Sequence, residues 1–298
     1  MACGSIASVE IPEQFNGLRV VLVNPRNPLN IGAAARAMSN FGFLRMRVVT
    51  PYEAGYREAR SAVGASEVLT NAEEFASLSE AIADCTLVVG TTAVGTRELH
   101  HRVKPLPEAG VMIRRRLTAG DDLGNVALLF GSERVGLSNE ELSHCHWLLR
   151  IPTRTEHRSM NLGQAVAVCM YELARLEGFG AGRGVAEEEG SSGNGTRSGE
   201  TTGTAVRSTK KRDRKVVRMR LEKKPATAGD VERITGTLLE ALHVAGYLTE
   251  KSGKAPREKI RRLIRRHGLT ANDADLWLSM LGQILYKLRK DGGESGGA

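Results

Sequence analysis

Short apolar runs alternate with helical periods over the first 177 residues of the chain. The runs are four to six residues long and mostly apolar, as buried parallel strands are, and they lie at residues 18–23, 45–49, 86–90, 126–130 and 147–151. Between them, helical spacing of apolar residues occurs at 31–40, 72–84, 139–144 and 161–177. This alternation predicts an α/β domain with a central parallel sheet over residues 17–177, after an N-terminal tail at residues 1–16.

The pattern changes sharply after Glu177. Residues 178–203 hold nine glycines with Ser, Thr and three consecutive glutamates, and a basic run follows. Such a composition cannot build a core, so we expect residues 178–229 to form a flexible linker. Apolar stripes at helical spacing return near residue 230. They predict a small all-α domain at residues 230–290, followed by a frayed tail at residues 291–298.

Composition excludes several classes of protein. The chain has 298 residues, of which 41% are hydrophobic and 26% charged, so it can bury a sizeable core. It has no run of 18 apolar residues and no basic segment followed by an apolar one at its start, so we expect no membrane span and no secretory signal. The four cysteines form no CxxC motif and no cluster with histidine. We therefore expect no disulfide framework, no metal site and a cytoplasmic location.

Positive charge is concentrated in the C-terminal part of the chain. Residues 1–177 carry 18 basic and 19 acidic side chains, whereas 207–224 carry 10 and 2, and 251–290 carry 11 and 3. Such basic stretches either bind a polyanion, most simply nucleic acid, or are only solvated. Near residue 260, three apolar residues define one helix face. That face leaves five arginines towards solvent as candidate RNA-binding residues: Arg257, Arg261, Arg262, Arg265 and Arg266.

Three segments carry candidate chemistry, and the first joins the strand at 18–23 to a helix. Asn30 is the expected N-cap of that helix, and Gly32 with the three alanines after it lets another backbone approach. Arg36 lies one turn further on, among small apolar residues. Because a buried arginine needs an anion, Arg36 either pairs with a core carboxylate or binds an anionic ligand. The segment has neither GxGxxG nor P-loop spacing, which disfavours a nucleotide site of those kinds.

The second and third segments each follow a strand. A turn with two glycines begins at Gly131 and carries Glu133 beside an arginine. It is either an ordinary loop or a ligand-binding loop at the end of a strand. The third segment runs from Ile151 to a helix start near Asn161. Ser159 is either a simple N-cap of that helix or a functional residue.

In this order the three segments resemble the signature motifs of the SpoU branch of SPOUT RNA methyltransferases. The first motif matches Asn30, Gly32, Arg36 and Phe41-Gly42, the second matches residues 130–133 and 136–137, and the third matches residues 151–152 and 159–162. The resemblance covers residues 17–177, and the C-terminal helical stretch resembles more loosely the extension of the TrmJ subfamily. It implies a parallel sheet with a trefoil knot near its C-terminal end, a homodimer, and S-adenosylmethionine as cofactor.

Matching motif positions implies the residues of two sites. The cofactor site would consist of residues at strand ends and in adjoining loops: Thr91, Thr92, Ala93, Gly131, Ile151, Arg158, Ser159 and Met160. The catalytic set would be Arg36, Glu133, Ser159 and Asn161. Because arginine stays protonated, we expect Arg36 to hold an RNA phosphate and the developing oxyanion. We expect Ser159 and Asn161 to orient the sugar, and Glu133 to hold Arg36 or loop amides.

The reaction that the resemblance implies is methyl transfer to a ribose 2′-hydroxyl of tRNA, at a cytidine or uridine at nucleotide 32 of the anticodon loop. One alternative is the same reaction on ribosomal RNA or at another tRNA position. A second alternative is a catalytically silent RNA-binding protein on the same scaffold. The joint presence of Arg36, Glu133, Ser159 and Asn161 favours an enzyme, and the helical extension favours tRNA.

Overall fold

The computed structural model describes residues 13–51, 66–93, 99–119, 123–175, 224–249 and 254–294. Within these residues, seven parallel strands form one sheet in the order β3-β2-β1-β6-β4-β7-β5. The five predicted strands occupy its five central positions, so the predicted α/β class with a parallel sheet is confirmed. The strands are β1 (Leu18–Val23), β2 (Met46–Val49), β3 (Glu73–Phe75), β4 (Cys85–Thr91), β5 (Val103–Pro105), β6 (Asn125–Phe130) and β7 (Trp147–Arg150).

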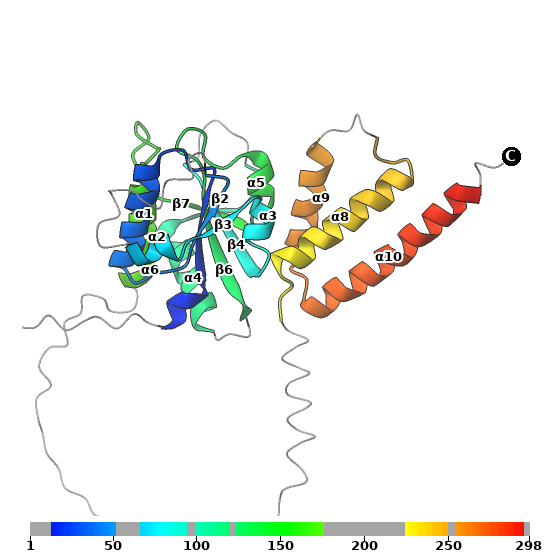
Figure 1. The fold of residues 1–298 in the computed structure, drawn as a ribbon, viewed down its shortest axis with the longest axis horizontal. Helices are drawn as coiled ribbons and strands as arrows, with labels where there is room; N and C mark the ends of the chain where they lie inside the picture. Colours follow the sequence, from blue (N-terminus) through cyan, green and yellow to red (C-terminus); the bar gives the residue numbers. More distant parts are fainter. Residues whose placement is uncertain are drawn as a thin grey trace, which may run out of the picture.

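Helices cover both faces of the sheet (Figure 1). On one face lie α1 (Pro28–Asn40), α4 (Leu106–Thr118) and α6 (Leu162–Arg175), and on the other lie α3 (Leu78–Ala81) and α5 (Asn139–Ser143). Successive side chains of β1 point to opposite faces. Val20 and Leu22 therefore join the apolar cluster of α1, whereas Val21 and Val23 join the cluster of Leu78 on α3.

The helix predicted at residues 72–84 is wrong. Residues 73–75 pair with β2 as the edge strand β3, and Ser77 caps the short helix α3 by accepting a hydrogen bond from the Glu80 amide. The predicted tail at 1–16 is also too long. Phe15, in the 3-10 helix η1 (Glu13–Gly17), is 2% exposed and stacks on Phe43. The edge strand β5 and the helices α2 (Ser66–Thr70) and α4 were not predicted.

The C-terminal residues form the three expected helices, α8 (Ala228–Val244), α9 (Ala255–Arg266) and α10 (Ala271–Glu294). They enclose an apolar cluster that includes Ile234, Ile264 and Leu281. Reciprocal hydrogen bonds between Thr227 and Asp230 cap α8, so this helix starts slightly before residue 230. α10 continues past residue 291, where the tail was predicted to begin. Most of the predicted linker, residues 178–223, lies outside the described residues, as do residues 176–177 and 295–298.

Two of the C-terminal helices, α8 and α9, contact the face of the sheet that carries α3 and α5. The Gly229 amide donates a hydrogen bond to the Ala83 carbonyl at 3.1 Å. Arg261, on α9, donates two hydrogen bonds to the Glu232 carboxylate on α8, at 2.7 and 2.8 Å, and a third to the Ser143 hydroxyl on α5 at 2.7 Å. A buried side chain therefore links α9 both to its own bundle and to the sheet domain.

None of the helices in the described ranges is long and apolar enough to cross a bilayer. In the same ranges, no three His, Cys, Asp or Glu side chains lie close enough together to hold a metal ion. Cys85, Cys145 and Cys169 are buried free thiols, and burial raises their pKa values well above the ordinary range. These thiols stay protonated at neutral pH and fill core space.

Candidate functional site

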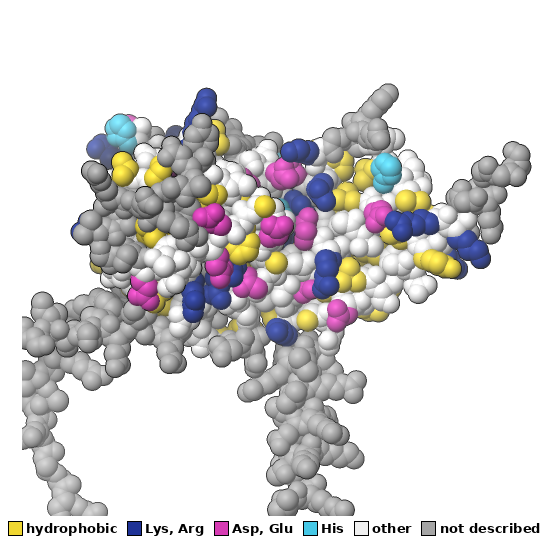
Figure 2. Space-filling model, in the orientation of Figure 1, with side chains coloured by type: hydrophobic (Ala, Val, Ile, Leu, Met, Phe, Trp, Pro, Cys, Tyr) yellow, Lys and Arg dark blue, Asp and Glu magenta, His cyan; other side chains and the backbone are white. Residues whose placement is uncertain are grey.

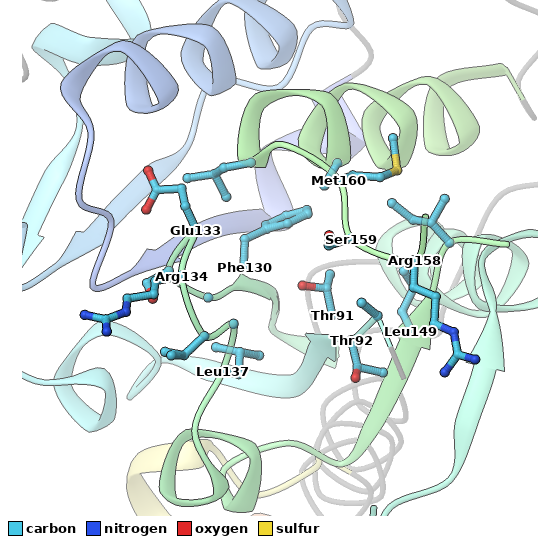
Figure 3. Close-up of a pocket in the computed structure, with 18 of the residues that line it drawn as sticks. Thr91, Thr92, Phe130, Glu133, Arg134, Leu137, Leu149, Arg158, Ser159 and Met160 are labelled. Atoms are coloured by element: carbon cyan, nitrogen blue, oxygen red, sulfur yellow. The ribbon is translucent and has the colours of Figure 1, made fainter. Parts of the chain in front are cut away.

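A cavity of about 450 Å³ lies at the carboxyl ends of β4, β6 and β7, enclosed by the loops that follow them (Figure 3). All eight residues of the predicted cofactor site line it: Thr91, Thr92, Ala93, Gly131, Ile151, Arg158, Ser159 and Met160. Apolar side chains, among them Phe130, Leu137 and Leu149, form much of the remaining wall. An apolar cavity of this size with a few polar groups suits a small organic ligand.

The turn after β6 folds tightly back on itself beside the cavity. Ser132 and Gly136 form an antiparallel bridge that folds the chain back over Gly131. A Cβ atom on Gly131 would lie 2.1 Å from the Gly136 carbonyl carbon and 2.2 Å from the Leu137 nitrogen. Both are backbone atoms that cannot rotate away, so this position accepts only glycine. Gly136 has a φ of +67°, the left-handed region that the turn requires.

Glu133 fastens this turn to the start of α1. Its carboxylate accepts hydrogen bonds from the amides of Arg26 and Asn27, at 2.9 and 3.2 Å, and from the Asn30 side-chain nitrogen at 2.9 Å. Partial burial opposes ionisation of Glu133, but these donors outweigh it and hold its pKa below the ordinary value. Glu133 therefore positions loop amides, as expected, and its carboxylate is occupied as an acceptor.

Asn30 connects Glu133 to the third motif. Its side-chain oxygen accepts a hydrogen bond from the Asn161 side chain at 2.8 Å, and the Asn161 oxygen accepts one from the Gly163 amide at 2.9 Å. Asn161 thereby caps α6. Asn27, rather than Asn30, caps α1 by accepting a hydrogen bond from the Leu29 amide, so the predicted N-cap is wrong. Asn30 is instead the bridging residue of the site, a role that the analysis of the sequence missed.

Arg36 and Ser159 lie in different surroundings. Ser159 lines the cavity beside Met160, on the loop that precedes α6 (Figure 3). Arg36 is exposed on α1, and it lies about 9 Å of helix beyond Asn30. It does not line the cavity, so the expectation that it is buried with an anion partner is wrong. Three of the four candidate catalytic residues thus meet at the cavity or in the hydrogen-bond network beside it, and Arg36 does not.

Comparison with known proteins decides the family. A model of the SpoU rRNA methylase family matches residues 17–171, more than half of the chain. The chain belongs to the SpoU rRNA methylase family. The matched region contains the whole parallel sheet and every residue that lines the cavity. The second and third motifs of the SpoU resemblance thus meet at this cavity, and Asn30 of the first motif is hydrogen-bonded to both of them.

The similarity of this SpoU chain to individual relatives extends beyond the region that the family model matches. The chain is 31% identical over 273 residues to a tRNA (cytidine/uridine-2′-O-)-methyltransferase TrmJ of Yersinia pestis, an alignment that covers 91% of this chain and 92% of the relative. It is 36% identical over 159 residues to an uncharacterized tRNA/rRNA methyltransferase of Haemophilus influenzae, covering 53% of this chain and 63% of the relative. The crystal structure of TrmJ from Z. mobilis ZM4 is similar with a TM-score of 0.66 at 26% identity, covering 89% of this chain and 98% of that one.

The basic helix α9 of this SpoU protein presents a different face from the one predicted. Arg261 and Arg265 are 2% and 5% exposed, whereas Leu263 is 46% exposed. The prediction that all five arginines face solvent is therefore wrong for these two. On the side drawn in Figure 2, basic and acidic side chains are interspersed near the junction of the two parts. Of the other three arginines on α9, Arg257 and Arg266 are exposed, whereas Arg262 is half-buried and pairs with Glu258 at 3.6 Å.

Proposed function

We propose that this protein transfers a methyl group from S-adenosylmethionine to the ribose 2′-hydroxyl of cytidine or uridine in tRNA, at nucleotide 32. The observation that carries the proposal is the cavity, because one pocket gathers all eight cofactor residues expected from the motifs. The TrmJ relatives, similar over almost the whole chain, support tRNA as substrate. We place the enzyme in the cytoplasm, with its tRNA substrates.

The residues present fit the proposed cofactor. Gly131 brings backbone to the cavity wall where any Cβ would collide, as close recognition of a nucleoside by main-chain groups requires. Thr91, Thr92 and Ser159 add hydroxyl groups to an apolar wall. When bound, the sulfonium supplies an already activated methyl group. We include a trefoil knot in the proposed fold, supported by the meeting of the loops after β6 and β7 at this one cavity.

The chain's own residues would position the RNA and stabilise charge. Glu133, Asn30 and Asn161 fix the starts of α1 and α6 beside the cavity. Ser159 on the cavity wall would orient the sugar. A ribose hydroxyl is a weak acid, so its proton leaves as the C–O bond forms, to an RNA phosphate or to water. The guanidinium of Arg36 would hold the neighbouring phosphate and the developing oxyanion.

A homodimer would explain the position of Arg36. Arg36 is exposed on α1, whose neighbour in the fold is α6. The same layer carries Leu29 and Tyr171, which are 55% and 53% exposed. We propose that two chains associate through this layer, which would place Arg36 at the contact between them. Light scattering of the purified chain should give twice the monomer mass. Leu29→Glu should lower it to the monomer mass without changing cofactor affinity.

The helical bundle is the proposed second domain, and it would bind tRNA rather than take part in the chemistry. Its exposed arginines Arg257 and Arg266 would contact phosphates of the tRNA backbone. The buried Arg261 and Arg265 are excluded from that surface. Guanidinium groups attract phosphate without reading sequence, so the choice of nucleotide would be made at the cavity.

The proposal is tested by incubating the full chain with S-adenosylmethionine and unmodified tRNA, and by mapping the modified position. A 2′-O-methyl group blocks alkaline cleavage of the next phosphodiester, so the product appears as a single gap in the cleavage ladder. We expect that gap at nucleotide 32 when it is cytidine or uridine. The family description refers to ribosomal RNA, so ribosomal RNA is tested in parallel. Methylation of a base, or of ribosomal RNA alone, would contradict the proposal.

A further inference from the structure

Arg265 is a buried cation without a partner. It lies in the last turn of α9 and is 5% exposed. All three of its guanidinium nitrogens are buried, and none has a hydrogen-bond partner among the described residues. A buried, unpaired guanidinium costs several kcal/mol relative to water. Burial lowers the pKa of Arg265 to about 10, so the group is still charged at neutral pH.

The only nearby carboxylate that affects Arg265 favourably in the described structure is already engaged. Glu232 receives two hydrogen bonds from Arg261, which occupy both of its oxygens. Arg261 and Arg265 together carry two positive charges against this single carboxylate. Their mutual repulsion further disfavours the charged form of Arg265. The junction between α9 and the sheet domain therefore has an excess of buried positive charge.

Arg265 lines a second cavity, separate from the candidate active site. Its volume is about 470 Å³, and it lies between the sheet domain and the helical bundle. No acidic residue is found among the described residues of its wall. The polar and charged part of that wall comes from β4, from α4, from the residue before β7 and from α9, and includes Thr86, Arg115, Arg116, His146 and Arg265.

The other basic residues of the wall have donors to spare. Arg116 gives one hydrogen bond to the Thr86 hydroxyl at 3.0 Å, but its buried Nε has no partner in the described structure. His146 accepts a hydrogen bond from the Val88 amide on Nδ1 at 3.0 Å, and burial lowers its pKa to about 3. The neutral ring therefore carries its proton on Nε2 as a donor. Donors on α4, on α9 and on the residue before β7 thus line a cavity whose described wall carries no carboxylate.

We propose that this cavity binds a phosphate group, with Arg265 at its buried end and Arg116 on its side. Guanidinium groups offer the planar, paired donors that match the oxygens of phosphate. The cavity is much larger than one phosphate, so the group can belong to a larger molecule. It is either a small phosphate compound or a phosphate of bound RNA. Because Arg116 belongs to α4 and Arg265 to α9, the bound anion joins the helical bundle to the sheet domain.

The first experiment compares thermal unfolding of the full chain in sodium phosphate and in sodium chloride of equal ionic strength. The wild type should unfold at a higher temperature in phosphate. Arg265→Met should lose this difference, and in chloride it should be at least as stable as the wild type because an unpaired buried charge is gone. Lys259→Met, which removes an exposed charge from the same helix, should respond to phosphate like the wild type. Equal responses of wild type and Arg265→Met would overturn the proposal.

The second experiment measures phosphate binding directly by isothermal titration. Arg265→Met and Arg116→Met should each weaken binding about tenfold or more, the effect of losing charge-assisted hydrogen bonds. The Arg116→Met arm decides the matter even if Arg265→Met does not fold. No phosphate binding to the wild type would refute the site. Repeating the titration with tRNA present separates the sources: competition identifies an RNA phosphate, and unchanged binding identifies a small phosphate compound.

Discussion

The bridging role of Asn30 makes the substitution Asn30→Asp informative. The two side chains have the same shape, so the change replaces one donor group by a carboxylate oxygen and leaves packing intact. The Asn30 nitrogen lies 2.9 Å from a Glu133 oxygen, and the variant would place two carboxylates in contact there. Asn30 lies in the first turn of α1, where the helix dipole alone would make a negative charge favourable. The contact with Glu133 therefore predicts that the variant is less stable than the wild type, whereas the helix dipole predicts that it is more stable.

The contact with Glu133 has a larger effect on the free energy of unfolding than the helix dipole has. Two unit charges 2.9 Å apart in water repel by about 1.4 kcal/mol, and the lost charge-assisted hydrogen bond adds about 1.5–3 kcal/mol. Protonating an ordinary aspartic acid instead costs about 4 kcal/mol at pH 7 and about 1.5 kcal/mol at pH 5. A carboxyl whose folded-state pKa is raised destabilises the protein increasingly as the pH rises above its unfolded-state pKa, and fully above the folded-state pKa. The loss of unfolding free energy should therefore be about 3 kcal/mol at pH 7 and no more than about 1.5 kcal/mol at pH 5.

The assay is the difference in melting temperature between wild type and variant at the two pH values. At about 2–4 °C per kcal/mol, the deficit should be about 6–12 °C at pH 7 and should at least halve at pH 5. Asn40→Asp adds the same charge at the other end of α1 and should show a small deficit that does not change between these pH values. The double variant with Glu133→Gln should recover part of the loss at pH 7. A melting temperature at or above that of the wild type at pH 7 would refute the reasoning.

Three further predictions concern Gly131 at the cavity, the proposed contact of Arg36 with an RNA phosphate, and the basic helix α9. Gly131→Ala should abolish binding of S-adenosylmethionine in isothermal titration without added metal, because its methyl group would overlap backbone atoms of the turn; binding that requires a divalent ion would contradict the cofactor assignment. Arg36→Ala should lose methyl transfer, with cofactor affinity within a few-fold of wild type. Arg36→Lys should restore little activity because a lysine ammonium lacks the planar, paired donors of a guanidinium group. Near-normal turnover by Arg36→Ala would contradict this role. Neutralising the exposed Arg257 and Arg266 together should flatten the salt dependence of tRNA binding by about one slope unit per lost contact. Arg261→Ala should instead cost about 2–3 kcal/mol of stability because Glu232 loses its partner.

The sequence predicts the centre of the sheet better than its edges. The five central strands are buried on both sides, so each is a continuous apolar run that can be recognised locally. The edge strands β3 and β5 are only three residues long and include Glu73 and Lys104, so no apolar run marks them. Their pairing with β2 and β7 depends on neighbours that are distant in sequence. The helix predicted at 72–84 failed for this reason.

Local pattern was also insufficient where a side chain has a distant partner. Periodicity assigned Arg261 to solvent, but Glu232 and Ser143 lie 29 and 118 residues away, and they make its burial favourable. The bridge from Asn30 to Asn161 spans 131 residues and is likewise invisible to spacing. The residues proposed for the cofactor could be placed at one cavity because each lies at a strand end or in the loop after it, and parallel strands bring those ends together. Arg36 matched its motif equally well, yet the motif carries no information on which surface it occupies.

The position of β1 in the middle of the sheet constrains how the chain is made. One edge of β1 pairs with β2, which follows closely, but the other pairs with β6, which begins at Asn125. A ribosome adds about 5–20 residues per second, so about 5–20 s separate the synthesis of β1 from that of its second neighbour. During that interval the nascent chain carries an unpaired edge of Val and Leu residues, a template for association with other chains. Slow translation of the first 130 residues would therefore lengthen the period in which the chain depends on chaperones.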